Sequence, residues 1–288
     1  MDRNYLRSAD VVLLPGARTG RDPARSIKPG PRRQPAGVVA ATQRERLLDG
    51  LVQTVAERGY QHATVSDICR AAGVTRPVFY ELFSGKEDAF LAAHRYGTGV
   101  VLRRMAGAFA AESDWCHGIR QALGAMLQLL AGTPAFATIA VIEIEAVGAE
   151  GRREREQLLT RFRAFFAEVP QLPGGVRVDE MVDAVVGGVY SALYRGIASG
   201  RTDRLPELLP VLSMFCLAPF LGPAEAAVRL GPAEAAEAVR LSPAEAAARP
   251  GAAEAPVRTV PAETAERLGA GIGEDPSCTR IDPANTGQ

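Results

Sequence analysis

Residues 64–87 read TVSDICRAAGVTRPVFYELFSGKE, and this stretch decides the fold of the amino-terminal part of the chain. Thr64 with Asp67 three residues later predicts a capping box, in which each side chain bonds the backbone of the other at the start of a helix. Gly73 predicts the end of that helix, because glycine adopts the left-handed conformation at low cost. The result is a helix of about two turns.

A second short helix follows directly. Thr75 is a favourable N-cap, and Pro77 falls in the first turn, where its missing N–H is tolerated. Ser84-Gly-Lys-Glu87 predicts another capping box and a longer helix after it. Two short helices joined by a tight glycine turn form a helix–turn–helix, in which the first helix braces the second.

The second helix of this unit has two chemically different faces. Phe79 and Phe83 are four residues apart and predict a buried face, whereas Arg76 and Tyr80 share the opposite face. A guanidinium can donate two hydrogen bonds to a guanine edge, and a phenol can reach a base or a phosphate. Lys86, in the first turn of the next helix, is expected to meet a phosphate.

The rest of residues 41–220 also has a helical period, as in the apolar positions 47, 48, 51, 52 and 55 ahead of Gly59. We predict an all-α protein. Its parts are a disordered basic arm (1–40), a three-helix helix–turn–helix domain (41–97), a larger helical ligand-binding and dimerisation domain (98–221), and a low-complexity Ala/Pro/Glu-rich tail (222–288) with near-repeats of LGPAEAA.

The order of these motifs resembles the DNA-binding domain of the TetR family of regulators. The resemblance covers about residues 42–95 and rests on Gly59-Tyr60, Thr64-Val65, Ala71-Ala-Gly-Val74, Phe79-Tyr80, Phe83 and Lys86-Glu87. It implies that Phe79 and Phe83 lie in the core and that Ser66, Arg76, Val78, Tyr80 and Lys86 lie at the DNA surface. The full set of expected DNA-binding residues is Thr64, Val65, Ser66, Thr75, Arg76, Pro77, Val78, Tyr80 and Lys86.

The larger domain is expected to bind a ligand and to dimerise. Small residues at 187, 188, 191, 192 and 196 and the apolar segment 205–220 predict two helices that pair with their copies in a four-helix dimer interface. Aromatic and aliphatic residues, with a Glu or Tyr as polar anchor, are expected to line an apolar pocket, although for any single one of them a place in an ordinary core is favoured. The candidates are Phe136, Ile139, Glu143, Phe162, Phe166, Tyr190 and Tyr194.

Composition argues against several other functions. The formal charge is zero, and the four cysteines are far apart, with no spacing typical of a metal site. No catalytic triad or phosphate-binding loop is evident, so we expect neither an enzyme nor a bound cofactor. The longest strongly apolar stretch, Val211–Leu221, is shorter than a membrane helix, and we expect a cytoplasmic protein with reduced thiols.

The predicted function is therefore that of a transcriptional regulator. We expect a homodimer that binds a palindromic operator on double-stranded DNA and is released by a small-molecule ligand, which makes it a repressor. An activator, or a regulator controlled by a protein partner, has the same sequence features. An all-helical enzyme is a further, weaker alternative.

Overall fold

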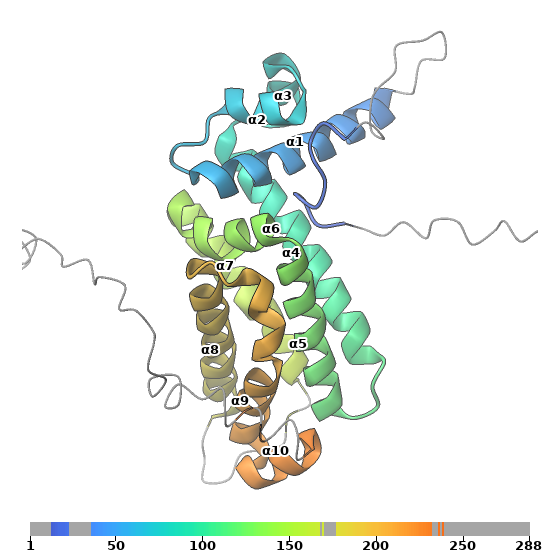
Figure 1. The fold of residues 1–288 in the computed structure, drawn as a ribbon, viewed down its shortest axis with the longest axis vertical. Coiled ribbons are helices and arrows are strands. Elements are labelled where there is room, and N and C mark those ends of the chain that lie inside the picture. The colour runs from blue at the N-terminus through green and yellow to red at the C-terminus, as the bar shows by residue number, and fades with distance from the viewer. Residues whose placement is uncertain are drawn as a thin grey trace, which may run out of the picture. The chain divides into compact units, whose positions relative to one another are not determined.

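The computed structural model describes residues 13–22, 36–167, 169, 177–231, 236 and 238. The described residues are helical, with no strand among them (Figure 1), so the predicted all-α class is confirmed. The predicted disorder of residues 1–12, 23–35 and most of the tail concerns parts of the chain outside the described residues.

The amino-terminal helices form the predicted helix–turn–helix unit. They are α1 (Ala36–Arg58), α2 (Val65–Ala72) and α3 (Arg76–Leu82), which meet the first turns of α4 (Lys86–Ala110). The apolar stripe of α1 is buried against the shorter helices, and α1 ends at Gly59, whose φ is +77°. Burying one stripe of each helix lets three short helices share a single core.

Local signals set the helix ends in this unit. The capping box of Thr64 and Asp67 is present, and Gly73 ends α2 with a φ of +61°. Thr75 occupies the N-cap of α3 in extended conformation without a side-chain hydrogen bond. The box predicted at Ser84 is not formed, because α4 begins at Lys86 and its N-cap is Gly85, which has no side chain to accept a hydrogen bond. The Ser84 N–H and hydroxyl both donate to the Asp88 carboxylate instead.

The second set of helices surrounds a larger core. It comprises α5 (Trp115–Gly132), α6 (Pro134–Thr138), α7 (Ala149–Phe162), α8 (Val178–Ala198) and α9 (Leu209–Leu221), with short turns between them at η3 (Glu145–Val147), η4 (Arg163–Phe166) and η6 (Thr202–Leu208). The long helix α4 packs along α5 and continues from the helix–turn–helix into this core (Figure 1).

The stretch after α6 departs from a regular helix. Helix α6 passes into a π-helical turn, η2 (Ile139–Glu143), and then into the 3₁₀ turn η3. A π-turn places one additional residue in the helical circuit. It therefore changes the direction in which the residues that follow point.

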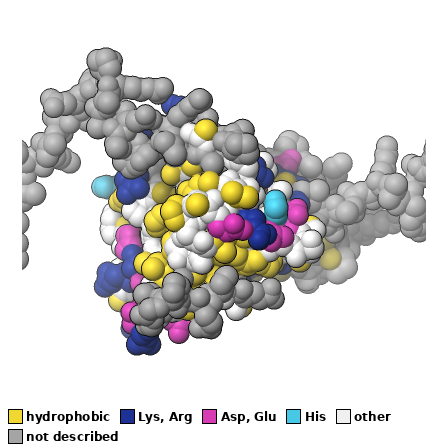
Figure 2. All heavy atoms as spheres, turned by 90° about the horizontal axis from the view of Figure 1, so that it is seen from below, with side chains coloured by type: hydrophobic (Ala, Val, Ile, Leu, Met, Phe, Trp, Pro, Cys, Tyr) yellow, Lys and Arg dark blue, Asp and Glu magenta, His cyan; other side chains and the backbone are white. Residues whose placement is uncertain are grey.

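The first copy of the carboxy-terminal near-repeat belongs to the fold. It forms α10 (Pro223–Leu230), which packs on α9 and buries Ala226 completely, and Arg229 approaches the Asp114 carboxylate at 3.4 Å. Seen from the α10 end, hydrophobic side chains occupy the middle of the surface, and acidic, basic and His side chains gather beside them (Figure 2). The packed helices therefore continue beyond the expected domain end at residue 221, because the small alanines of α10 are sufficient for it to pack on α9.

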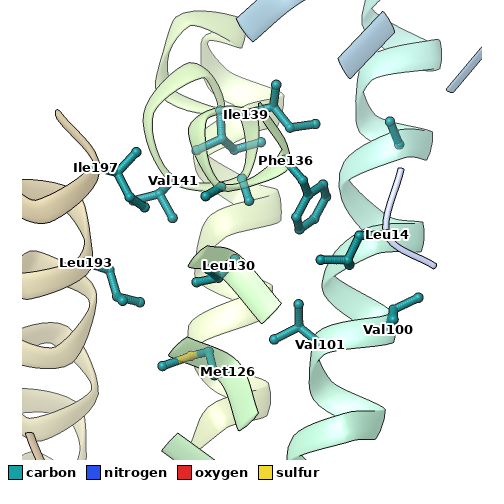
Figure 3. Packing of buried hydrophobic residues seen from close by; sticks show 14 of the residues in the cluster. Leu14, Val100, Val101, Met126, Leu130, Phe136, Ile139, Val141, Leu193 and Ile197 are labelled. Carbon is teal, nitrogen blue, oxygen red and sulfur yellow. The ribbon is translucent and has the colours of Figure 1, made fainter. Parts of the chain in front are cut away.

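Part of the expected disordered arm is also ordered. Residues 13–22, here called the brace, lie along α1, and Leu14 is 4% exposed. Figure 3 shows the Leu14 side chain beside Val101 of α4 and Phe136 of α6. The Arg-, Pro- and Gly-rich composition of residues 1–40 suggested disorder. Within this region, however, Leu14 is buried, and Gly16 and Gly20 pack closely against neighbouring residues.

One described helical stretch, Thr202–Leu221, is long and apolar enough to cross a membrane by length and composition alone, with 33% of its apolar window buried. It is longer than the Val211–Leu221 stretch seen in the sequence because η6 continues into α9. In this fold it packs against α5, α8 and α10.

Candidate functional site

Helix α3 presents the expected reading face to the outside. Arg76, Pro77 and Tyr80 are exposed, whereas Phe79 is completely buried and Val78 is half-buried. The Phe79 ring meets the Tyr80 ring edge-on at 5.3 Å between centroids, which fixes the base of the exposed phenol. The Arg76 guanidinium and the Tyr80 phenol thus lie on one exposed side of α3, and the buried Phe79 anchors the helix in the core.

The amino end of α2 lies on the outside as well. Ser66 and Thr75 are exposed, and Val65 is half-buried against the core. The Thr64 hydroxyl donates to Asp67 at 2.6 Å, and this bond, helped by nearby arginines, holds the pKa of Asp67 below its usual value. Thr64 is therefore engaged in capping α2, and Ser66 carries the freer hydroxyl toward the outside.

Lys86 is placed differently from the expectation. Its Nζ donates to the backbone oxygens of Tyr60 and Ala63 at 2.7 and 3.1 Å and lies 4.2 Å from the centre of the Tyr60 ring. Burial lowers the pKa of this ammonium group. The Lys86 side chain thus binds the two backbone carbonyls of the loop between α1 and α2 and does not extend toward the position expected for a phosphate.

The helical core contains two apolar cavities. The first, of about 50 Å³, has Met105, Phe162, Phe166 and Tyr190 in its wall. The second, of about 40 Å³, has Phe136, Phe162 and Tyr190 in its wall. The Tyr190 hydroxyl donates to the Val141 oxygen at 3.0 Å, and burial is the main cause that raises its pKa to about 12.

Three of the expected pocket residues lie elsewhere. Ile139 is completely buried in the core but lines neither cavity. Tyr194 is 42% exposed on α8. Glu143 accepts a hydrogen bond from the Tyr60 N–H at 2.6 Å, so it joins the ligand-side helices to the loop after α1. The π-turn η2 turns this carboxylate away from the cavities.

The comparisons with known proteins agree with this geometry. Residues 47–93 match the family model described as bacterial regulatory proteins, tetR family, and these residues contain the capped α2, the turn and α3. Over these residues the chain is similar to the TetR family.

Individual relatives are named as regulators of fatty acid metabolism or degradation. The fatty acid metabolism regulator protein of Bacillus subtilis is 25% identical over 114 residues, which are 40% of this chain and 59% of that protein. The structure of the fatty acid degradation regulator FadR from Bacillus halodurans superposes with a TM-score of 0.55 at 19% identity, covering 65% of this chain and 95% of the other.

A further solved structure, the transcriptional regulator FadR from Bacillus subtilis in complex with stearoyl-CoA, has a TM-score of 0.53 at 19% identity. It covers 61% of this chain and 97% of that one. At this identity the two structures show a similarity of fold, which covers more of the chain than residues 47–93.

The sequence analysis did not identify much of the cavity wall. Helix α5 contributes Ile119, Ala122, Leu123 and Met126 to the first cavity. Their spacing of three and four residues is a visible helical stripe. That stripe predicts burial but not a void, because a cavity depends on how facing helices fail to fill the space between them.

Proposed function

We propose that this protein reads DNA with α3 and the amino end of α2. The observation that carries the proposal is the exposure of Arg76 and Tyr80 on a short helix whose other side is anchored by the fully buried Phe79. Arg76 would read a base edge in the major groove, and Tyr80, Ser66 and Thr75 would contact base or backbone. We assign Lys86 to support of this surface.

The DNA-binding form would be a C2 homodimer built on α8 and α9. On α8, a Cβ placed at Gly187 would meet open space, while Gly188 is covered by Phe215 of α9. Phe215 is itself 42% exposed, an apolar area suited to burial against a second copy. A two-fold axis would place two recognition helices on successive major-groove faces, so the operator would be an approximate palindrome.

The ligand would carry a long apolar chain. The two cavities share Met126, Phe162, Tyr190 and Leu193 in their walls, so movement of these side chains would join them into one longer space. Their present volumes are too small for such a chain, and uptake would require that movement. The complex of the related FadR with stearoyl-CoA supports an acyl-CoA as the class of ligand.

Helix α4 would connect the ligand to the DNA. It begins at Lys86 beside the helix–turn–helix and places Met105 in the wall of the first cavity. A ligand that favours a displaced α4 must lower DNA affinity by the same factor by which DNA lowers ligand affinity. Such release makes the protein a ligand-relieved repressor, acting in the cytoplasm. A reporter gene in a deletion strain distinguishes repression from activation, since the expression changes have opposite signs.

Selection of bound sequences from a random DNA pool tests DNA reading. We expect a motif with two inverted half-sites. Arg76→Ala should weaken binding by about 1 to 3 kcal/mol and relax preference at one base pair in each half-site. Arg104→Ala removes the same charge from an exposed position further along α4 and should preserve the motif. Recovery of no repeated motif, or an unchanged preference in R76A, contradicts the proposal.

Stearoyl-CoA is the probe for the ligand. We expect stearoyl-CoA to dissociate the protein from the selected DNA. We expect coenzyme A alone to leave the protein–DNA complex intact, because it lacks the acyl chain that the apolar cavities would bind. Equal effects of the two compounds would contradict the acyl assignment.

A further inference from the structure

The brace touches three parts of the molecule that the proposed mechanism must coordinate. The first is α1. The Gly16 N–H donates to Oδ1 of Asp49 at 2.7 Å. A Cβ on Gly16 would lie 2.4 Å from Cγ1 of Val52, and the φ of Gly16 is +83°, so only glycine fits there without strain. This part of the brace is held by a specific hydrogen bond and by close packing.

The second contact is with the turn between α2 and α3. The Arg46 guanidinium donates through Nε to the Gly20 oxygen at 2.9 Å and to the Ala72 oxygen at 3.0 Å, and through Nη2 to the Gly73 oxygen at 3.1 Å. One cation therefore binds the brace and the carbonyl end of α2 together. Cations are favourable at this end of a helix, where the last carbonyls lack helical partners.

The end of the brace reinforces the same turn. Arg21 Nε donates to the Arg70 oxygen at 2.9 Å. A Cβ on Gly20 would lie 2.8 Å from the Ala71 oxygen, so the brace backbone is in direct contact with the last residues of α2. Because α3 begins at Arg76, a shift of the brace would move the turn on which the reading helix depends.

The third contact is with the ligand side. Leu14 is buried beside Val101 and Phe136 (Figure 3), and both of these residues also line the second cavity. Gly16 lies close to α6, since its Cβ would be 3.8 Å from Cβ of Ala135. Leu14 thus belongs to the same core cluster as these two residues of the cavity wall.

We propose that the brace, from Leu14 to Arg21, links the second cavity to the turn of the helix–turn–helix and positions α3 for DNA. A ligand that displaces Phe136 or Val101 would change the packing around Leu14 and shift the brace. Because the brace is hydrogen-bonded to Arg46 and Arg70, this shift would move the turn between α2 and α3. This connection runs in parallel with α4. It rests on the proposed function for its biological meaning, but the mechanical link can be measured without ligand or DNA.

Hydrogen–deuterium exchange of the full chain tests the link. Leu14→Ala acts at the cavity end and Arg21→Ala at the turn end. Each should speed exchange of the amides in residues 73–79 by about tenfold or more, since the loss of a hydrogen bond to a charged group (R21A) or of a buried leucine side chain (L14A) typically changes an equilibrium by at least that factor. Exchange in α8 should stay unchanged. Arg18→Ala removes the same charge from an exposed side chain of the brace and should match the wild type.

An unchanged turn in L14A and R21A, or equal acceleration throughout the chain, overturns the proposal. The second measurement is the ratio of DNA dissociation constants with and without stearoyl-CoA, which should fall toward one in L14A. An equal ratio in L14A and wild type also overturns the link. If the wild type selects no DNA or ignores stearoyl-CoA, the proposed function fails, while the exchange experiment still decides on the brace.

Discussion

Replacement of Lys86 by methionine distinguishes a structural role from a phosphate contact. Methionine keeps an unbranched apolar side chain over the Tyr60 ring and removes the ammonium group. The oxygens of Tyr60 and Ala63 then lose a charged donor at 2.7 and 3.1 Å. The loop between α1 and α2 loses the group that closes it.

The size of the effect follows from these two bonds. A hydrogen bond involving a charged group contributes about 1.5 to 3 kcal/mol, and the lost cation–π contact adds about 0.5 to 1 kcal/mol at a partly exposed site. Water reaches this half-buried site and replaces part of both bonds. We expect the free energy of unfolding to fall by about 2 kcal/mol, which lowers the Tm by about 4 to 8 °C in a chain of this size.

Urea unfolding gives the free energy, and DNA affinity across a salt series gives the number of phosphate contacts. We expect K86M to unfold more easily and to keep the wild-type salt slope. Glu87→Gln, on the exposed neighbouring position, controls for a change of charge at this helix end. Wild-type stability together with a salt slope reduced by about one unit would show that Lys86 binds a phosphate, and would refute the structural role.

Further predictions concern two glycines of α4 and the buried His94. Gly97→Ala would place a Cβ 2.1 Å from the Phe136 ring and should cost about 1 to 3 kcal/mol in a thermal melt, whereas Gly107→Ala, in open space on the same helix, should stabilise by about 0.5 to 1 kcal/mol. Burial lowers the pKa of His94 from 6.5 to about 4, although Glu154 opposes the shift. Stability should therefore fall by on the order of 3 kcal/mol between pH 6.5 and 4, as the unfolded state binds the proton first, and His94→Leu should remove this fall.

Local sequence signals were enough to predict the helix–turn–helix unit. The capping box at Thr64, the left-handed residue Gly73 and the opposite faces of Phe79 and Tyr80 each depend on residues a few positions apart. Backbone geometry relates such neighbours directly, so their structural meaning is visible in the sequence.

The contacts that join distant parts could not be predicted in this way. Lys86 has a long side chain that reaches either a phosphate or a nearby carbonyl, and only the position of the α1–α2 loop decides between them. The brace is held by hydrogen bonds between its backbone and the side chains of Asp49 and Arg46, and no sequence pattern predicts such bonds. The alanines of α10 predict a helix but not where it packs, since their burial depends on the position of α9.

The π-turn η2 makes the number of residues between α6 and η3 as important as their chemistry. Each residue in a helix advances the direction of the side chains by about 100°. Deletion of Ala140 would therefore rotate Glu143 away from the Tyr60 N–H, even though every functional side chain remained in the chain. This segment should tolerate exchange of one apolar residue for another far better than a change of length by a single residue, and variation within it should preserve the residue count.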